Sequence, residues 1–181
     1  MKSLSLAVAA LALGVPAATS TAAVITLGTP LAAECYRSAD SRILDSRGLW
    51  SCNRALEGAL DAENRSATYV NRGIVRMNRR DFAGAEADFN AALALDPEQT
   101  DAWLNKGFLR LRTGDADAAM PFLERALELR PRRPALAYLA RGIAHELSGN
   151  VRAAYADLTR ARDLEPGWDL PGRELSRYQV R

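Results

Sequence analysis

The sequence predicts an all-α protein in which repeated helical hairpins stack into an α-solenoid. A pattern occurs three times: an aromatic residue, a glycine four residues later, an alanine twelve residues after that glycine, and a closing proline. Glycine and proline are 24 residues apart in each copy (97 − 73, 131 − 107, 166 − 142), and the glycines are 34 and 35 residues apart (107 − 73, 142 − 107). The period is typical of solenoids, whose units bury their apolar faces against one another. The copies are Tyr69, Gly73, Ala85, Pro97; Trp103, Gly107, Ala119, Pro131; and Tyr138, Gly142, Ala154, Pro166.

The amino-terminal stretch has the composition of a secretory leader. Residues 3–33 carry no charge. Lys2 precedes an apolar run from Leu4 to Val15, Pro16 ends that run, and small residues follow at 17–23. A positive start, an apolar core and a small-residue end are the three parts of a signal peptide.

We therefore expect a signal peptide over residues 1–23, cut near Ala22 or Ala23, and a linker over 24–33. The alternative is an uncleaved amino-terminal membrane anchor, because the uncharged stretch is long enough to span a bilayer. Cleavage is favoured, since Thr, Ser, Gly and Pro residues within the stretch make a poor span. The expected location is periplasmic or secreted, with no stable membrane span in the mature chain.

Export bears on the state of the only two cysteines, Cys35 and Cys52, because it would place them in an oxidising compartment. In an oxidising compartment an isolated pair usually forms a disulfide. We expect residues 34–64 to form a degenerate first hairpin, with a turn at residues 44–48 and Cys52 in the position of the repeat alanine. A bond that closes a loop of this size adds about 3 kcal/mol in the chain-entropy model. The competing interpretation is a buried free thiol at Cys52.

Each clear repeat carries its own helix signals. The hairpins are expected over 66–99, 100–134 and 135–168, with a glycine on each first helix and an alanine on each second helix where the two come close. Short polar side chains cap the second helices, glycines suit the left-handed turns before two of them, and the prolines end them. The capping residues are Asp81, Asp115 and Asn150, and the turn glycines are Gly114 and Gly149.

Three positions depart from that scheme. Arg80 replaces the turn glycine in the first repeat, which should cost some stability. Pro121 falls inside the second helix of the middle repeat, so we expect a kink or a late helix start. Residues 169–181 should form a closing helix that shields the last repeat, with Asp169 as its cap and Pro171 in its first turn.

These residues and spacings resemble the tetratricopeptide repeat, a helix-turn-helix unit of about 34 residues. The resemblance covers residues 66–168 well and 34–64 more weakly. It implies a right-handed superhelix whose first helices line a concave groove that binds a protein or peptide. Asn71 and Asn105 could then bond the backbone of an extended peptide. The implied groove residues are Val70, Asn71, Ile74, Met77, Leu104, Asn105, Phe108, Leu111, Leu139 and Ile143.

Two other interpretations of this apolar stripe stay open. Apolar residues at helical spacing are usually core, and the chain's own amino-terminal segment or closing helix could fill a groove this short. A clamp for acidic carboxyl-terminal tails, known in this family, is disfavoured. Apolar side chains take the positions that would need polar or basic groups (Val70, Ile74, Leu136 and Ala140), and only Asn105 matches.

A ladder of basic residues runs along the first helices, two to each repeat. The pairs are spaced i, i+4 and so share a helix face. They could form a cationic strip, but we favour pairing with acidic residues on the second helices, because the net charge is only +2. The ladder is Arg72, Arg76, Lys106, Arg110, Arg141 and His145, and the acids are Glu86, Asp88, Glu124, Glu128 and Asp157.

Residues that could carry chemistry are scarce. His145 is the only histidine, and the chain has neither a phosphate-binding glycine loop nor a nucleophile motif. We expect no enzyme, no cofactor, no metal site and no nucleic-acid partner. The predicted function is a protein-interaction scaffold of the cell envelope; the alternative is a structural or assembly component of an envelope complex whose own termini fill the groove.

Overall fold

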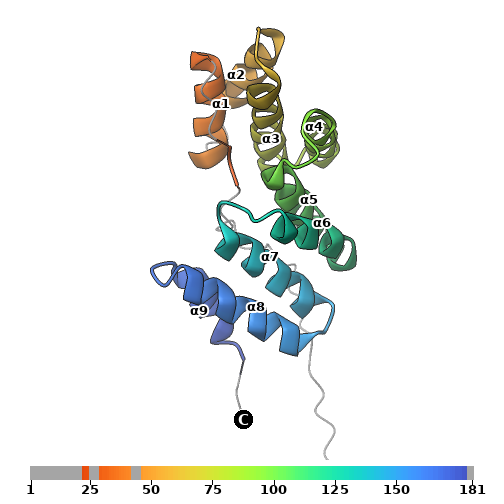
Figure 1. Ribbon diagram of the computed structural model, residues 1–181, viewed down its shortest axis with the longest axis vertical. Helices are drawn as coiled ribbons and strands as arrows, with labels where there is room; N and C mark the ends of the chain where they lie inside the picture. Colours follow the sequence, from red (N-terminus) through yellow and green to blue (C-terminus); the bar gives the residue numbers. More distant parts are fainter. Residues whose placement is uncertain (1–21, 25–28, 42–45, 179–181) are drawn as a thin grey trace, which may run out of the picture.

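The computed structural model describes residues 22–24, 29–41 and 46–178, and all regular structure in these ranges is helical. Figure 1 shows the helices stacked along one long axis, with α1 and α2 near one end and α9 at the other. The all-α solenoid is confirmed. The helices are α1 (Pro30–Ser41), α2 (Ser46–Glu57), α3 (Ala62–Asn78), α4 (Phe82–Leu95), α5 (Thr100–Arg112), α6 (Ala116–Glu128), α7 (Pro134–Leu147), α8 (Val151–Leu164) and α9 (Asp169–Leu175).

The repeats are the hairpins α3–α4, α5–α6 and α7–α8, preceded by α1–α2. The first helices of successive repeats, α3, α5 and α7, also contact one another in sequence. They therefore form the inner layer of the solenoid, and α4, α6 and α8 form the outer layer. The predicted signal peptide, up to residue 21, lies outside the described residues. No helix of the described part is long and apolar enough to cross a membrane.

The repeat glycines let each hairpin close, but their partners differ from those expected. A Cβ added to Gly107 would overlap the side chain of Leu123 on α6. A Cβ added to Gly73 would lie 2.5 Å from the ring of Phe89 on α4. A Cβ added to Gly142 would lie 3.0 Å from the side chain of Leu158 on α8. A large second-helix side chain therefore occupies the space each glycine leaves. The repeat alanines, one helical turn earlier, are fully buried as well.

The predicted caps of the second helices are confirmed. The side chains of Asp81, Asp115 and Asn150 each accept a hydrogen bond from a backbone N–H three residues on, at 3.0, 3.0 and 3.4 Å. Arg80 has a φ of 66°, in the left-handed region where the later repeats place Gly114 and Gly149. A side chain with a Cβ is strained there, so the expected penalty in the first repeat has a structural basis.

Several boundaries differ from those expected. Helix α6 begins at Ala116, so a late start caused by Pro121 is wrong, and Pro121 lies inside the helix. Helix α9 begins at Asp169 itself; Trp168 takes the cap position and makes no side-chain cap bond. Helix α1 begins at Pro30, within the expected linker, and α2 begins at Ser46, within the expected turn.

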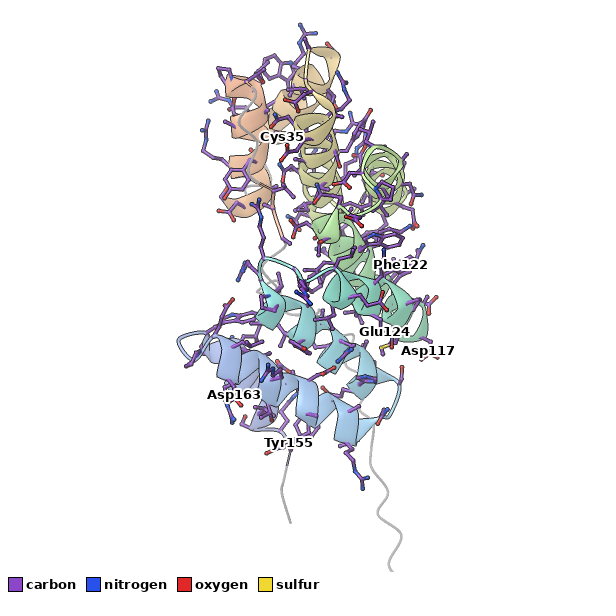
Figure 2. The ribbon with its side chains drawn as sticks, in the orientation of Figure 1. Cys35, Asp117, Phe122, Glu124, Tyr155 and Asp163 are labelled. Carbon is purple, nitrogen blue, oxygen red and sulfur yellow. A yellow bond between two sulfur atoms is a disulfide. The ribbon has the colours of Figure 1, made fainter. Side chains whose placement is uncertain are left out.

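The two ends of the solenoid are closed differently. At one end Cys35 of α1 and Cys52 of α2 form a disulfide with an S–S distance of 2.08 Å, and Figure 2 marks Cys35 among the packed helices at that end. Both cysteines are fully buried. At the other end α9 buries Leu170, Pro171 and Leu175. Two of these, Leu170 and Leu175, join a cluster with side chains of α7 and α8.

Candidate functional site

The expected groove residues lie on the inner helices, and in the whole chain they are not open to solvent. Nine of the ten expose between 0% and 4% of their surface. Ile143 is partly buried against the core. The stripe is therefore covered over most of its length. The nine buried residues are Val70, Asn71, Ile74, Met77, Leu104, Asn105, Phe108, Leu111 and Leu139.

An extended piece of the chain's own amino-terminal region lies on this face. The N–H of Val24 donates to Oδ1 of Asn71 at 2.9 Å, and Nδ2 of Asn71 donates to the carbonyl oxygen of Val24 at 2.7 Å. Nδ2 of Asn105 donates to the carbonyl oxygen of Ala22 at 3.2 Å. Ala22 and Val24 are only 4% and 8% exposed. The two asparagines thus hold an extended backbone, as the sequence had suggested for a peptide.

The two asparagines occupy the same place in successive repeats, two residues before the repeat glycine. One amide pairs with both backbone groups of a single residue, as a neighbouring β-strand would. The other reaches the residue two positions away, which lies on the same face of an extended chain. The third repeat has Ala140 at this place and offers no amide. The backbone-holding site therefore belongs to the first two repeats.

Asn105 keeps an unused hydrogen-bond acceptor. Its Nδ2 also donates to the carbonyl oxygen of Asp101 at 2.7 Å, but its Oδ1 is buried and has no hydrogen-bond partner among the described residues. A buried acceptor without a donor is unfavourable by about 1–3 kcal/mol. The site can therefore accept one more donor than the segment supplies.

A cavity of ≈ 550 Å³ opens beside Val24. Three carboxylates and one guanidinium line it, so its surroundings are acidic. Burial raises the pKa of the partly buried Asp101 to about 6, and the charges of Arg132 and Arg133 offset this only in part. The charged form of Asp101 is therefore disfavoured by its burial. The lining residues are Val24, Glu63, Asn64, Ala67, Asp96, Gln99, Asp101 and Arg132.

Sequence reasoning missed the acidic cavity, and it did not identify Ala22 and Val24 as the groove's contacts. It had named the amino-terminal segment as one possible filler. The repeat pattern contains no signal for these two residues, because they precede the first repeat. Their partners are 47 and 83 residues away in the chain, and only the folded solenoid brings them together.

The basic ladder is neutralised within the protein, as favoured from the sequence. Arg72 and Arg76 both bond the carboxylate of Asp88, at 2.7 and 2.9 Å, and Asp88 is 2% exposed. Arg141 bonds Asp157 at 2.7 Å, and this hydrogen bond raises the pKa of Arg141. His145 lies 3.9 Å from the same carboxylate. These residues do not form a free cationic strip.

The middle repeat uses its ladder to join its neighbour. Arg110 and Lys106 of α5 reach Glu86 of α4 at 2.6 and 3.7 Å. Nζ of Lys106 also lies 4.7 Å from the ring centre of Phe122, which Figure 2 labels on α6. Of the other expected acids, Glu128 bonds Arg125 of its own helix. In the described part no group of three or more His, Cys, Asp or Glu side chains could hold a metal ion.

Comparison with known proteins agrees with this architecture. A family model described as tetratricopeptide repeat matches residues 70–134. Tetratricopeptide repeat protein 36 from Homo sapiens is 32% identical over 96 residues, which are 51% of this chain and 51% of that protein. The chain thus matches about half the length of this curated relative.

Solved structures share the fold at lower identity. The first TPR of Spaghetti (RPAP3) bound to HSP90 peptide SRMEEVD has a TM-score of 0.60 and 20% identity, over 64% of this chain and 90% of that one. MamA 41-end from Desulfovibrio magneticus RS-1 has a TM-score of 0.61 and 20% identity, over 82% and 84%. At these identities the likeness concerns the fold.

Proposed function

This chain is a tetratricopeptide repeat protein, and we propose that it is an exported scaffold that binds an extended segment of another protein on its concave face. One observation carries the proposal: Asn71 and Asn105 hold the backbone of residues 22–24. Repeats of this family are protein-interaction units, and the peptide-bound relative described above supports a peptide as ligand. The pair of amides supplies the means of binding.

The chemistry of the face selects the class of ligand. Bonds from Asn71 and Asn105 go to backbone groups, so they do not depend on the ligand's side chains. The other expected groove residues of α3 and α5 are apolar, and the basic ladder is already paired with Glu86, Asp88 and Asp157. An extended segment of small or apolar, uncharged residues therefore fits best. An acidic tail would find no free cation among the paired ladder residues.

Cleavage of the leader would open part of this face. Cleavage after Ala22 or Ala23 removes Ala22, and with it the acceptor now bonded to Asn105. The N–H of Asn105 that now bonds Ala22 then becomes free for a partner. The leader's composition and the paired cysteines support export to the periplasm or outside the cell. An uncleaved leader that anchors the chain in the membrane is the alternative.

A second candidate function has support in the burial of the stripe. Nine of the ten expected groove residues are covered in the whole chain. A protein with a permanently filled groove would act as a structural or assembly component of an envelope complex and bind partners elsewhere. A peptide-binding experiment distinguishes the two candidates.

A library of extended peptides would be screened against the chain that begins at Val24. We expect the selected peptides to be apolar and uncharged. Asn105→Ala should weaken their binding roughly tenfold, since a lost hydrogen bond of about 1.4 kcal/mol corresponds to that factor. The matched control is Asn90→Ala, because Asn90 lies on the outer helix α4, where its Oδ1 accepts a hydrogen bond from Lys106. Selection of no peptide, or equal binding by both variants, would favour the filled-groove candidate.

A further inference from the structure

We infer that the new amino terminus created by leader removal stays in the groove, held as an α-ammonium group by Asn71 and the carboxylates of the neighbouring cavity. The inference rests on the proposed export, because only cleavage near Ala22 or Ala23 creates this terminus. The site is a receptor for the chain's own amino terminus.

Hydrolysis supplies the charged group. One water molecule is added across the peptide bond after Ala22 or Ala23, so that the leader leaves with a carboxylate and the chain begins with an amine. An α-amine has an ordinary pKa of about 7.7–8.0 and is mostly protonated at neutral pH. The nitrogen of Val24 already donates to Oδ1 of Asn71 at 2.9 Å. An amine at Val24 keeps its donors, so this bond can persist.

The cavity beside Val24 suits a positive charge. Glu63, Asp96 and Asp101 line it together with a single cation, Arg132. Arg133 also acts on Asp101 through its charge. Among the described residues these three carboxylates face Arg132 and the more distant charge of Arg133, so one more cation brings the site close to neutrality.

Asp101 gives this arrangement an energetic consequence. Its pKa is raised to about 6 by burial, so its charged form is disfavoured in the folded whole chain. The contribution of Asp101 to the free energy of unfolding is therefore greatest below the ordinary pKa of its carboxyl group. It falls as the pH rises toward 6. A nearby α-ammonium group would favour the charged carboxylate and reverse this penalty.

Burial also sets the order of events. Ala22 and Val24 are almost completely covered, and Ala23 between them is partly buried, so the two peptide bonds that join these residues are poorly accessible to a peptidase in the docked state. Cleavage must come before docking. The new terminus then occupies the first-repeat half of the face, while the half around Asn105 loses Ala22.

The test measures the pKa of the amine in a chain made to begin at Val24, by NMR with a labelled terminal nitrogen. We expect a pKa about one unit or more above the ordinary range of about 7.7–8.0. Asp101→Asn should lower the pKa of the amine toward that range. The matched control Asp163→Asn should not, because Asp163 is an exposed residue of α8 that bonds Arg162. An ordinary pKa in the unmodified chain, or no effect of Asp101→Asn, would overturn the inference.

Acetylation of the terminal amine provides a second test of the inference, because it removes the positive charge and keeps the N–H of Val24. At pH 8 Asp101→Asn should raise the melting temperature of the acetylated chain and lower that of the chain with a free amine. Shifts of the same sign in both chains would contradict the inference. Both proteins are prepared to begin at Val24, so these measurements do not depend on export. A failure of the proposed export is detected in a separate experiment, as an intact leader in exported material. A failure of peptide binding is likewise measured apart from these titrations.

Discussion

The two ends of the solenoid solve the same problem by different means. A stack of repeats exposes an apolar face at each end, which must be covered for the protein to be soluble. At the amino-terminal end the hairpin α1–α2 covers α3 and is held by the Cys35–Cys52 disulfide. At the carboxyl-terminal end the seven-residue helix α9 buries Leu170, Pro171 and Leu175, and its two leucines pack against α7 and α8. The first closure is partly covalent, and the second depends on apolar contact.

This difference teaches where each end is vulnerable. Because each repeat contacts only its neighbours, the stability of a solenoid is approximately a sum of local terms. A redox change should loosen one end and leave the other intact. A change in apolar packing should do the opposite. Four predictions test the comparison.

The largest effect is expected in the middle repeat, which connects the two ends. Gly107→Leu should lower the free energy of unfolding by more than about 3 kcal/mol, since overpacking a tight contact costs about 1–3 kcal/mol and a leucine is far larger than the Cβ that already overlaps Leu123. Urea denaturation measures it. Gly142→Ala, where the added Cβ stays 3.0 Å from Leu158, is the milder companion and should cost less. Equal stability of Gly107→Leu and the unchanged chain would refute the contact.

The disulfide comes next. Replacing Cys35 and Cys52 together by alanine should destabilise the amino-terminal end by about 3 kcal/mol, the value for a loop of this length in the chain-entropy model. Hydrogen exchange should show faster opening of α1 and α2, with α7–α9 unchanged. Uniform loss of protection along the chain would mean that the two ends are not independent.

The closing helix tests the other end. Leu170 is 3% exposed, and Leu170→Ala should cost about 2–3 kcal/mol, at the lower end of the range for buried leucines because a short terminal helix can relax around the gap. Exchange should quicken in α8 and α9 and not in α1. Unchanged protection of α8 would show that α9 contributes no closure.

The smallest effect is a gain. Arg80→Gly should raise the free energy of unfolding by about 1 kcal/mol, because a left-handed backbone costs roughly 1–2 kcal/mol for a residue with a Cβ, and the greater freedom of glycine in the unfolded chain returns part of it. The change also removes a charge that acts on Arg112. Thermal melting checks the gain. A loss of stability would indicate that Arg80 makes a favourable contact in the folded state.

The sequence by itself determined the features that depend on residues close together in the chain. The caps at Asp81, Asp115 and Asn150 act within three residues, so a local pattern suffices to predict them. The glycine period placed the hairpins, because a small residue is needed wherever two helices approach closely. The pairing of the basic ladder also followed, since i, i+4 spacing aims two cations at one face. The same local reasoning failed at Asp169, where Trp168 takes the cap position in the turn from α8.

Only the tertiary structure decided the state of the concave face. The pattern placed Val70, Phe108 and Leu139 on that face but could not say what covers them. The contact of Val24 with Asn71, and that of Ala22 with Asn105, join residues far apart in the chain, and no periodicity carries such information. The pKa of Asp101 is equally hidden, because it arises from burial that α5 acquires when the solenoid assembles. Caps and helix spacings depend on residues close together in the sequence, so a local pattern predicts them. Contacts between distant residues depend on the free energy of the whole packed chain.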